Sequence, residues 1–264
     1  MYDIHVDMQA IQIRNYKLGD GNLLLCAPLT AKEPNGLLQE AKEIQKSKVQ
    51  MAEWRIDLFD MDPSYERIVE LIGQLREILQ EKILLATIRT KQEGGAFEGS
   101  QEKYVQIYNW VLQTRQADLI DIEYEIGDAW RDTLIENAHA HDCKVILSFH
   151  DFENTPTVSK MCEKLTGMMK TKGDIAKLAV MPTTKKDVAA LLEASAIISS
   201  DAEKPLITMS MGSKGMISRF AGGLFGSSVS FVNVCGSSAP GQLKAEEILQ
   251  FLALLQKTQA ADLM

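Results

Sequence analysis

The chain has few cysteines, and the four present stand singly rather than in CxxC pairs. This argues against a disulfide framework or a thiolate metal site and fits a reduced compartment. No apolar run approaches the roughly 20 residues that a membrane helix needs. The first residues also lack a basic head followed by a long apolar stretch. We therefore expect a cytoplasmic protein that has no membrane partner.

Positive charge is also scarce. Lys and Arg number 28 against 36 Asp and Glu, a formal net charge of −8, and the basic residues are scattered along the chain. This distribution disfavours a nucleic-acid partner. Hydrophobic residues make up 45% of the chain and the mean hydropathy is −0.10, which is enough apolar material for a sizeable core. No Pro/Gly/Ser-rich or charge-dense stretch divides residues 1–264, so we expect a single domain.

Short apolar or β-branched runs recur along the chain and predict eight strands. They lie at residues 22–30, 49–57, 83–89, 119–125, 144–152, 175–182, 206–212 and 229–234. Between them, apolar residues recur every three to four positions, as in 64–80, 102–117 and 186–200, which predicts helices. The runs begin 23 to 36 residues apart, close to one strand plus one crossover helix. This spacing favours a parallel sheet.

Eight such units predict an α/β fold of the (β/α)8 TIM barrel type. The alternative is an open doubly wound sheet, but no GxGxxG follows the first strand and the chain is too short for a second domain. Residues 1–20 fall outside the eight units. Their alternating pattern predicts an N-terminal β-hairpin that closes the bottom of the barrel, and a partly disordered leader is the alternative.

Charged residues inside apolar strands are the informative anomaly. Burying an unpaired charge costs several kcal/mol, and barrel enzymes build their sites at the C-terminal ends of the strands. Five of the eight predicted strands carry charged or titratable residues at or just beyond that end. These residues are Glu53 and Arg55, Arg89 and Glu93, Asp121 and Glu123, His150, and Lys177.

Lys177 stands between apolar residues in DIAKLAVMP, without a polar neighbour to solvate it. An amine that loses hydration becomes a usable nucleophile toward a ketone, as in Schiff-base enzymes. The alternative is a lysine that pairs with a strand-end carboxylate or reaches the rim. His150 ends a strand in LSFHDF, where an imidazole can remove and return a proton at neutral pH. Taken alone, it could equally be a core or capping histidine.

Three arginines, Arg55, Arg89 and Arg219, can offer planar donor pairs to a carboxylate or to ring hydroxyls. For Arg55 the alternative is an ion pair with Glu53, two positions away on the same strand face. Glu93 precedes two glycines, which would let the loop turn and present the carboxylate to the barrel mouth. A solvated loop glutamate is the competing interpretation.

No metal site is expected. The closest pair of ligand residues on one element is His139 and His141, and an i, i+2 pair points to different helix faces. The segment CGSSAPGQ at 235–242 follows the eighth predicted strand and is rich in small residues. Its composition is typical of a mobile loop whose Ser and Gln side chains can hydrogen-bond a ligand.

Together these motifs resemble the type I 3-dehydroquinate dehydratases. The resemblance rests on EWRID (53–57), TIRTKQEGG (87–95), LIDIEYE (119–125), SFHDF (148–152), DIAKLAVMP (174–182), MGSKGMISRF (211–220) and SAPGQ (238–242). It implies a barrel with an N-terminal hairpin, a homodimer, and an enzyme of the shikimate pathway that needs no cofactor. One departure is Cys235 and Gly236, which stand where members usually have Lys or another longer polar residue. This puts the rigidity of the last loop in question.

The resemblance also implies a role for each site residue. Lys177 would form an imine with 3-dehydroquinate, His150 would be the general base and acid, and Glu93 would orient His150. Arg219 would hold the substrate carboxylate. The remaining residues would bind ring hydroxyls and the carboxylate region or close the site, namely Glu53, Arg55, Arg89, Ser238 and Gln242.

Two other functions were weighed against this one. A Schiff-base aldolase on the same barrel would also need a lysine on the sixth strand, but such enzymes show a Gly-rich phosphate loop after strands seven and eight. Here that region carries Arg219 and SAPGQ. A non-catalytic ligand-binding barrel would be favoured by the loss of Lys177, His150 or Glu93, and all three are present.

Overall fold

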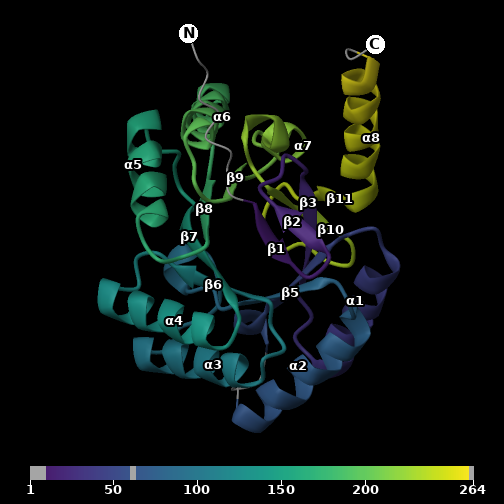
Figure 1. The fold of residues 1–264 in the computed structure, drawn as a ribbon, viewed down its shortest axis with the longest axis vertical. Helices are drawn as coiled ribbons and strands as arrows, with labels where there is room; N and C mark the ends of the chain where they lie inside the picture. The colour runs from purple at the N-terminus through teal and green to yellow at the C-terminus, as the bar shows by residue number, and fades with distance from the viewer. Residues whose placement is uncertain (1–9, 60–63, 262–264) are drawn as a thin grey trace.

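Eight parallel strands form the centre of the molecule (Figure 1). The structure, a computed structural model, describes residues 10–59 and 64–261. Each strand lies inside one of the eight predicted runs. The strands are β3 (Leu24–Leu29), β4 (Met51–Arg55), β5 (Ile83–Thr87), β6 (Leu119–Glu123), β7 (Lys144–Asp151), β8 (Ile175–Val180), β9 (Leu206–Ser210) and β10 (Val229–Asn233). Parallel strands that are buried on both faces are apolar along their whole length, so they can be recognised in the sequence as continuous apolar runs.

The strands close into a barrel. Their order is β10-β3-β4-β5-β6-β7-β8-β9, with every neighbouring pair parallel. A bridge between Leu206 and Ser227 joins β9 to the residues just before β10, and the Ser228 N–H donates to the Leu206 carbonyl at 2.7 Å. The predicted (β/α)8 barrel is therefore confirmed. A short strand that was not predicted, β11 (Leu243–Lys244), pairs with the end of β10.

Helices surround the strands as an outer ring (Figure 1). They are α1 (Pro34–Lys46), α2 (Tyr65–Leu79), α3 (Gln101–Gln113), α4 (Asp128–Ala140), α5 (Val158–Met169), α6 (Lys185–Ser200), α7 (Ile217–Ala221) and α8 (Ala245–Ala261), with 3-10 turns η1 (Ile56–Leu58), η2 (Lys91–Glu93) and η3 (Gly222–Phe225). Side-chain oxygens of Ser64, Ser100, Thr157 and Thr184 cap the N-termini of α2, α3, α5 and α6. No helix in the described ranges is long and apolar enough to cross a membrane.

The lower barrel interior is apolar and is covered by the hairpin of β1 (Ile11–Ile13) and β2 (Tyr16–Leu18). Ile13 and Leu18 are buried against the first residues of several strands, among them Leu24, Ile83 and Leu119. The predicted hairpin at the bottom of the barrel is confirmed over these residues, whereas residues 1–9 of the prediction lie outside the described ranges. This plug leaves the opposite end, where the strands finish, for the site.

Candidate active site

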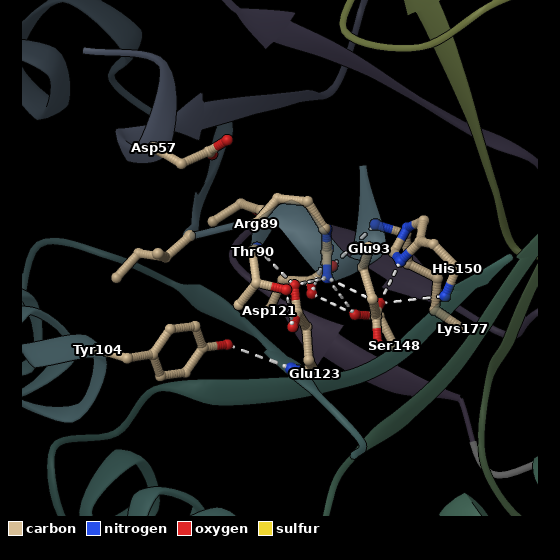
Figure 2. Close-up of polar contacts among 12 residues, drawn as sticks. Asp57, Arg89, Thr90, Glu93, Tyr104, Asp121, Glu123, Ser148, His150 and Lys177 are labelled. Atoms are coloured by element: carbon tan, nitrogen blue, oxygen red, sulfur yellow. Dashed lines mark hydrogen bonds and ion pairs between the residues drawn. The ribbon is translucent and has the colours of Figure 1, made fainter. Parts of the chain in front are cut away.

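The charged strand residues converge at the C-terminal end of the barrel around one small cavity (Figure 2). Its volume is about 40 Å³. Eight of the nine predicted site residues line it: Glu53, Arg55, Arg89, Glu93, His150, Lys177, Ser238 and Gln242. The side chains of Phe152, Met209, Met211 and Phe231 complete the wall and carried no signal in the sequence beyond being apolar. Residues from five strands, from the segment after β5 and from the last loop thus face one space.

Lys177 lies on β8 and is 3% exposed. Its Nζ donates to Oδ2 of Asp121 on β6 at 2.8 Å (Figure 2). The same Nζ lies 4.5 Å from the ring centroid of Phe231. Lys177 is therefore paired with a strand carboxylate, the alternative that the sequence left open. Strand neighbours along the chain are apolar, but the barrel brings in a carboxylate 56 positions away.

Asp121 is fully buried and accepts three hydrogen bonds. Besides Lys177, Arg89 Nη2 donates to Oδ1 at 2.6 Å and Ser148 Oγ donates to the same oxygen at 2.5 Å. Burial alone would raise the pKa of Asp121, but Arg89 and Lys177 outweigh it and hold that pKa well below its usual range. Asp121 is thus a permanent anion directly beside the amine.

His150 is held by Glu93, which lies in η2. Nδ1 of His150 lies 2.8 Å from Glu93 Oε2, and the His150 backbone N–H donates to the same oxygen at 3.1 Å. Glu93 is 6% exposed, so the interpretation as a solvated loop glutamate is wrong. Because Glu93 engages Nδ1, Nε2 is the ring nitrogen available to a ligand.

Burial shifts both members of this pair toward their neutral forms. Burial, together with the positive charges of Arg89 and Lys177, lowers the pKa of His150 well below its usual value, so the ring is an uncharged base at neutral pH. Burial also raises the pKa of Glu93 to about 8, because the nearby carboxylates of Glu123 and Asp121 add to it and Arg89 only partly opposes it.

A glycine after η2 allows this geometry. Gly94 adopts φ +79°, and a Cβ there would lie 2.3 Å from the ring of Phe152. Phe152 in turn stacks on the His150 ring, with ring centroids 6.4 Å apart and planes 24° apart. The glycine predicted to turn the loop therefore also lets Phe152 pack against it beside the base.

Arg55 pairs with Asp57 and not with Glu53. The Arg55 guanidinium donates two hydrogen bonds to Asp57, at 2.8 and 2.7 Å, while Glu53 accepts from Thr87 Oγ1 at 3.0 Å. The alternative in which Glu53 and Arg55 bind each other is therefore wrong. Both side chains remain turned toward the cavity. Asp57 was missed, although its place two residues after Arg55 was visible in EWRID.

Arg219 lies behind the cavity and does not line it. It sits in α7 with 1% exposure, and its guanidinium donates to the carbonyl oxygens of Phe231 and Pro240, each at 3.2 Å. Its Nε has no hydrogen-bond partner, and no carboxylate of the described chain pairs with it. Burial lowers the pKa of Arg219 to about 10.

The loop at 235–242 lies over the cavity and is held by few bonds. Gln242 Nε2 donates to Ser238 Oγ at 3.1 Å, and the Ser238 N–H donates to Gln242 Oε1 at 3.2 Å. Pro240 supplies the link to the barrel, because its carbonyl also accepts from the Gly212 N–H at 3.1 Å. Across residues 10–59 and 64–261, no group of three or more His, Cys, Asp and Glu side chains could hold a metal ion.

Sequence reasoning also missed the network behind the cavity. Arg89 Nη1 donates to Ser148 Oγ at 2.9 Å and to Glu123 Oε1 at 3.2 Å, and it lies 3.4 Å from Glu93 Oε2 (Figure 2). Asp121 and Glu123 were visible as charges inside LIDIEYE, but their partners were not. Arg89 thus joins the carboxylate beside Lys177 to the carboxylate that holds His150.

A parallel barrel whose strand ends bring a buried amine and a neutral imidazole to one cavity defines a barrel enzyme. Comparisons with known proteins make this specific. A family model described as type I 3-dehydroquinase matches residues 25–259. The chain therefore belongs to the type I 3-dehydroquinase family, which is a family of hydro-lyases, and the resemblance carried by the seven motifs is confirmed.

Individual relatives agree with the family match. Proteins named 3-dehydroquinate dehydratase from Listeria welshimeri and Clostridioides difficile are each 36% identical, over 95% and 94% of this chain and 99% and 98% of their own. A type I 3-dehydroquinate dehydratase structure from Clostridium difficile, with covalently modified comenic acid, has 35% identity and a TM-score of 0.91 over 96% of this chain and all of its own. A 3-dehydroquinate dehydratase structure from Geobacillus kaustophilus has 31% identity and a TM-score of 0.93, covering 96% and 99%.

Proposed function

We propose that this protein dehydrates 3-dehydroquinate to 3-dehydroshikimate through an imine on Lys177, with His150 as general base and acid. One observation carries the proposal. Lys177 and His150 lie on adjacent strands, β8 and β7, and line the same cavity, each held at 2.8 Å by a buried carboxylate. A held amine beside a neutral base is what imine formation and proton abstraction next to it require.

The chemistry follows from these groups. The neutral amine of Lys177 adds to the C3 ketone, and loss of water gives an iminium, an electron sink that acidifies the adjacent C2–H. His150 takes that proton to give the enamine. The enamine then expels the C1 hydroxyl, which leaves as water when His150 returns the proton. Hydrolysis of the remaining imine consumes one water and frees both product and amine, so one water is released overall.

Glu93 supports the base by fixing the His150 ring through Nδ1, which leaves Nε2 for the proton transfer. Because His150 carries no charge at neutral pH, it can accept the C2 proton without first losing one. We propose that Glu93 orients the ring in both directions of proton transfer.

Arg219 is proposed to hold the substrate carboxylate. A buried guanidinium without a carboxylate partner is costly, so an incoming anion would be strongly favoured there. At present its donors reach the Sδ of Met209 and the carbonyl oxygens of Phe231 and Pro240, the last of which belongs to the loop. A ligand carboxylate would compete with that loop contact.

The other cavity residues are proposed to bind the ring. Glu53 and Arg55 face the space with oxygen acceptors and guanidinium donors suited to hydroxyls. Arg89 adds positive charge at the carboxylate region, although most of its donors serve neighbouring side chains. Ser238 and Gln242 would bind from the loop.

The size of the cavity supports a moving loop. Its volume of about 40 Å³ leaves room for only a few water molecules, each of which needs on the order of 10 to 15 Å³. A six-membered ring with a carboxylate and three hydroxyls cannot enter without displacement of the covering segment. The loop at 235–242 is held to the barrel mainly through the Pro240 carbonyl, so we propose that it opens for the substrate and closes over it.

The physiological setting is proposed on the basis of the family. A relative solved with covalently modified comenic acid supports covalent chemistry, and the shikimate pathway is the corresponding setting. We further propose a cytoplasmic homodimer. Exposed apolar side chains of Met216, Ile217 and Leu224 near α7 support a second copy as partner. Sedimentation of the purified protein would test the dimer.

Borohydride trapping tests the chemistry. Reduction in the presence of 3-dehydroquinate should attach the ligand to Lys177 alone, as found by peptide mapping, while turnover is followed through the ultraviolet absorbance of the conjugated product. Chelators should leave turnover intact, because the iminium supplies the electron sink that a metal would provide. An adduct on Lys214, or active enzyme without an adduct, would rule out this mechanism.

A further inference from the structure

Asp121 is a buried anion that the proposed reaction does not use. It lies on β6, two strands away from Lys177, and contacts the amine at 2.8 Å. Asp121 is not among the residues that line the cavity, whereas Lys177 is. The carboxylate is therefore behind the amine and cannot touch a substrate, so any effect it has on the reaction passes through Lys177.

Two further groups hold Asp121. Ser148 stands opposite both Glu123 and Lys177 in the strand register, and its hydroxyl donates to Asp121 Oδ1 at 2.5 Å. Arg89 donates to the same oxygen at 2.6 Å. Each of these bonds draws negative charge away from the oxygen that faces Lys177, and so weakens its hold on a proton of the ammonium group.

We infer that Asp121 is a positioning residue for Lys177, and that with Ser148 and Arg89 it sets the pH at which the neutral amine becomes available. An ammonium group cannot attack a ketone, so the anion that fixes the amine also raises the pH above which the amine can react. The hydrogen bonds from Ser148 and Arg89 to Asp121 make that increase smaller. The inference rests on the proposed imine at Lys177.

Other charged or titratable groups surround Lys177 in the barrel. They are Cys26 on β3, Glu53 and Arg55 on β4, Arg89 and Glu93 after β5, Asp121 and Glu123 on β6, and His150 on β7. Within the described chain, Asp121 is the one member of this set that accepts a hydrogen bond from Lys177 Nζ. A change at Asp121 therefore has the largest expected effect on the amine.

The test is the pH dependence of imine formation, measured by rapid mixing with 3-dehydroquinate and borohydride quench. It is done in a His150→Ala background, so that the base itself does not titrate. Asp121→Asn removes the anion while keeping the shape. The rising limb of the rate should move to lower pH by about 1 to 2 units, because an opposite charge at this distance no longer favours the ammonium form.

Ser148→Ala should move the limb the other way. Without the hydroxyl, Asp121 still binds Lys177 but carries more negative charge on its oxygens. The rising limb of the rate should therefore move to higher pH by about half a unit. Ser195→Ala is the matched control, because it removes an equally buried hydroxyl that pairs with Thr208, outside the lining of the cavity. Its limb should coincide with that of the parent. Titration of Glu93 is common to all variants.

Opposite shifts in the two variants would support the inference, since a merely structural defect would lower the rate at every pH. An unchanged limb in Asp121→Asn, or shifts of both variants in one direction, would overturn it. If Asp121→Asn does not fold, Ser148→Ala decides alone, and an unmoved limb overturns the inference. Absence of any trapped imine in the native protein would instead refute the proposed function.

Discussion

Asp118 and Asp121 stand three residues apart, Asp118 just before strand β6 and Asp121 at its middle. Asp118, just before β6, accepts from Arg14 Nε at 2.7 Å, from Arg76 Nη2 at 2.6 Å and from the Leu84 N–H at 2.8 Å. Asp121 likewise accepts from one arginine, one lysine and one hydroxyl. Both are nearly buried anions with three donors each, yet only one lies beside a cavity.

The two aspartates differ in whether one of their donors can lose a proton and reach a ligand. At the bottom both charged partners are arginines, which cannot be deprotonated in proteins, and the space between the strands is filled by aliphatic side chains and the hairpin. At the top one partner is Lys177, which faces a cavity and can lose a proton. A buried ion network thus becomes a site where one member is both titratable and open to a ligand.

The largest effect should come from the top of the barrel. His150→Ala is expected to lower turnover by about 10²- to 10⁴-fold while leaving the imine on Lys177 trappable, because proton transfer contributes on that scale. Turnover and borohydride trapping on the same preparation would check it. Near-normal turnover would remove His150 from the mechanism, and loss of trapping would mean that His150 also serves imine formation.

The bottom of the barrel should behave in the opposite way. Asp118→Asn leaves Arg14 and Arg76 without their anion, and we expect the free energy of unfolding to fall by about 3 kcal/mol, while kcat below the melting range is unchanged. Urea unfolding and turnover would be measured side by side. A loss of kcat without a loss of stability would show that the two ends are coupled in function.

Much of this contrast was predictable from the sequence, and its limits are physical. Apolar runs located all eight strands, and charges at the strand ends located the site, because buried parallel strands tolerate charge only where it is used or paired. The partners of those charges were not predictable. Lys177 meets Asp121 across 56 positions and two strands, a contact that exists only in the folded sheet.

Local patterns misled at one ion pair and left one depth open. Glu53 and Arg55 share a strand face, but the turn η1 brings Asp57 back to Arg55 with better two-point geometry. Arg219 lies in α7 and does not line the cavity, so its role at the substrate carboxylate stays a prediction. Neither turn geometry nor the depth of an arginine is encoded in residue spacing, so both needed the folded chain.

A smaller effect is expected in the pH dependence of stability. Glu93 keeps its proton up to about pH 8 in the folded protein, while the unfolded side chain loses it near 4.5. The folded state therefore holds an extra proton between these values, and raising the pH destabilises it. Below pH 6.5 His150 opposes this, because its unfolded ring binds a proton that the buried ring refuses. From pH 6.5 to 8, Glu93 acts alone.

Over that window the free energy of unfolding should fall by about 2 kcal/mol in the native protein. Glu93→Gln removes the titrating carboxyl and should flatten the dependence. Urea titrations at pH 6.5 and 8 would measure both. An equal decline in the two proteins would mean that another group titrates there, and that Glu93 is ionised throughout.

The smallest expected effect concerns the loop at 235–242. Unlike the surroundings of Asp118 and Asp121, this loop is not held by a buried ion network. Besides its internal bonds, it is tied to the barrel through the Pro240 carbonyl, to Gly212 and Arg219, and its small side chains bury little apolar area. A bound ligand adds bonds to Ser238 and Gln242. We expect the loop amides to exchange about tenfold more slowly with product present, a difference near 1.4 kcal/mol.

Gly241 offers a way to separate closure from chemistry. It adopts φ +77°, and a Cβ there would lie 2.3 Å from the Gly212 carbonyl oxygen, so Gly241→Ala cannot close in the same way. This variant should lose the ligand-dependent protection and show a raised KM, yet still form the imine on Lys177. Ser237→Ala, in the same loop but outside the cavity lining, should keep the ligand-dependent protection and the KM of the native protein. If hydrogen exchange in the native loop is equally slow with and without product, then Gln242 belongs to a preformed wall, and closure plays no part in excluding water from the iminium.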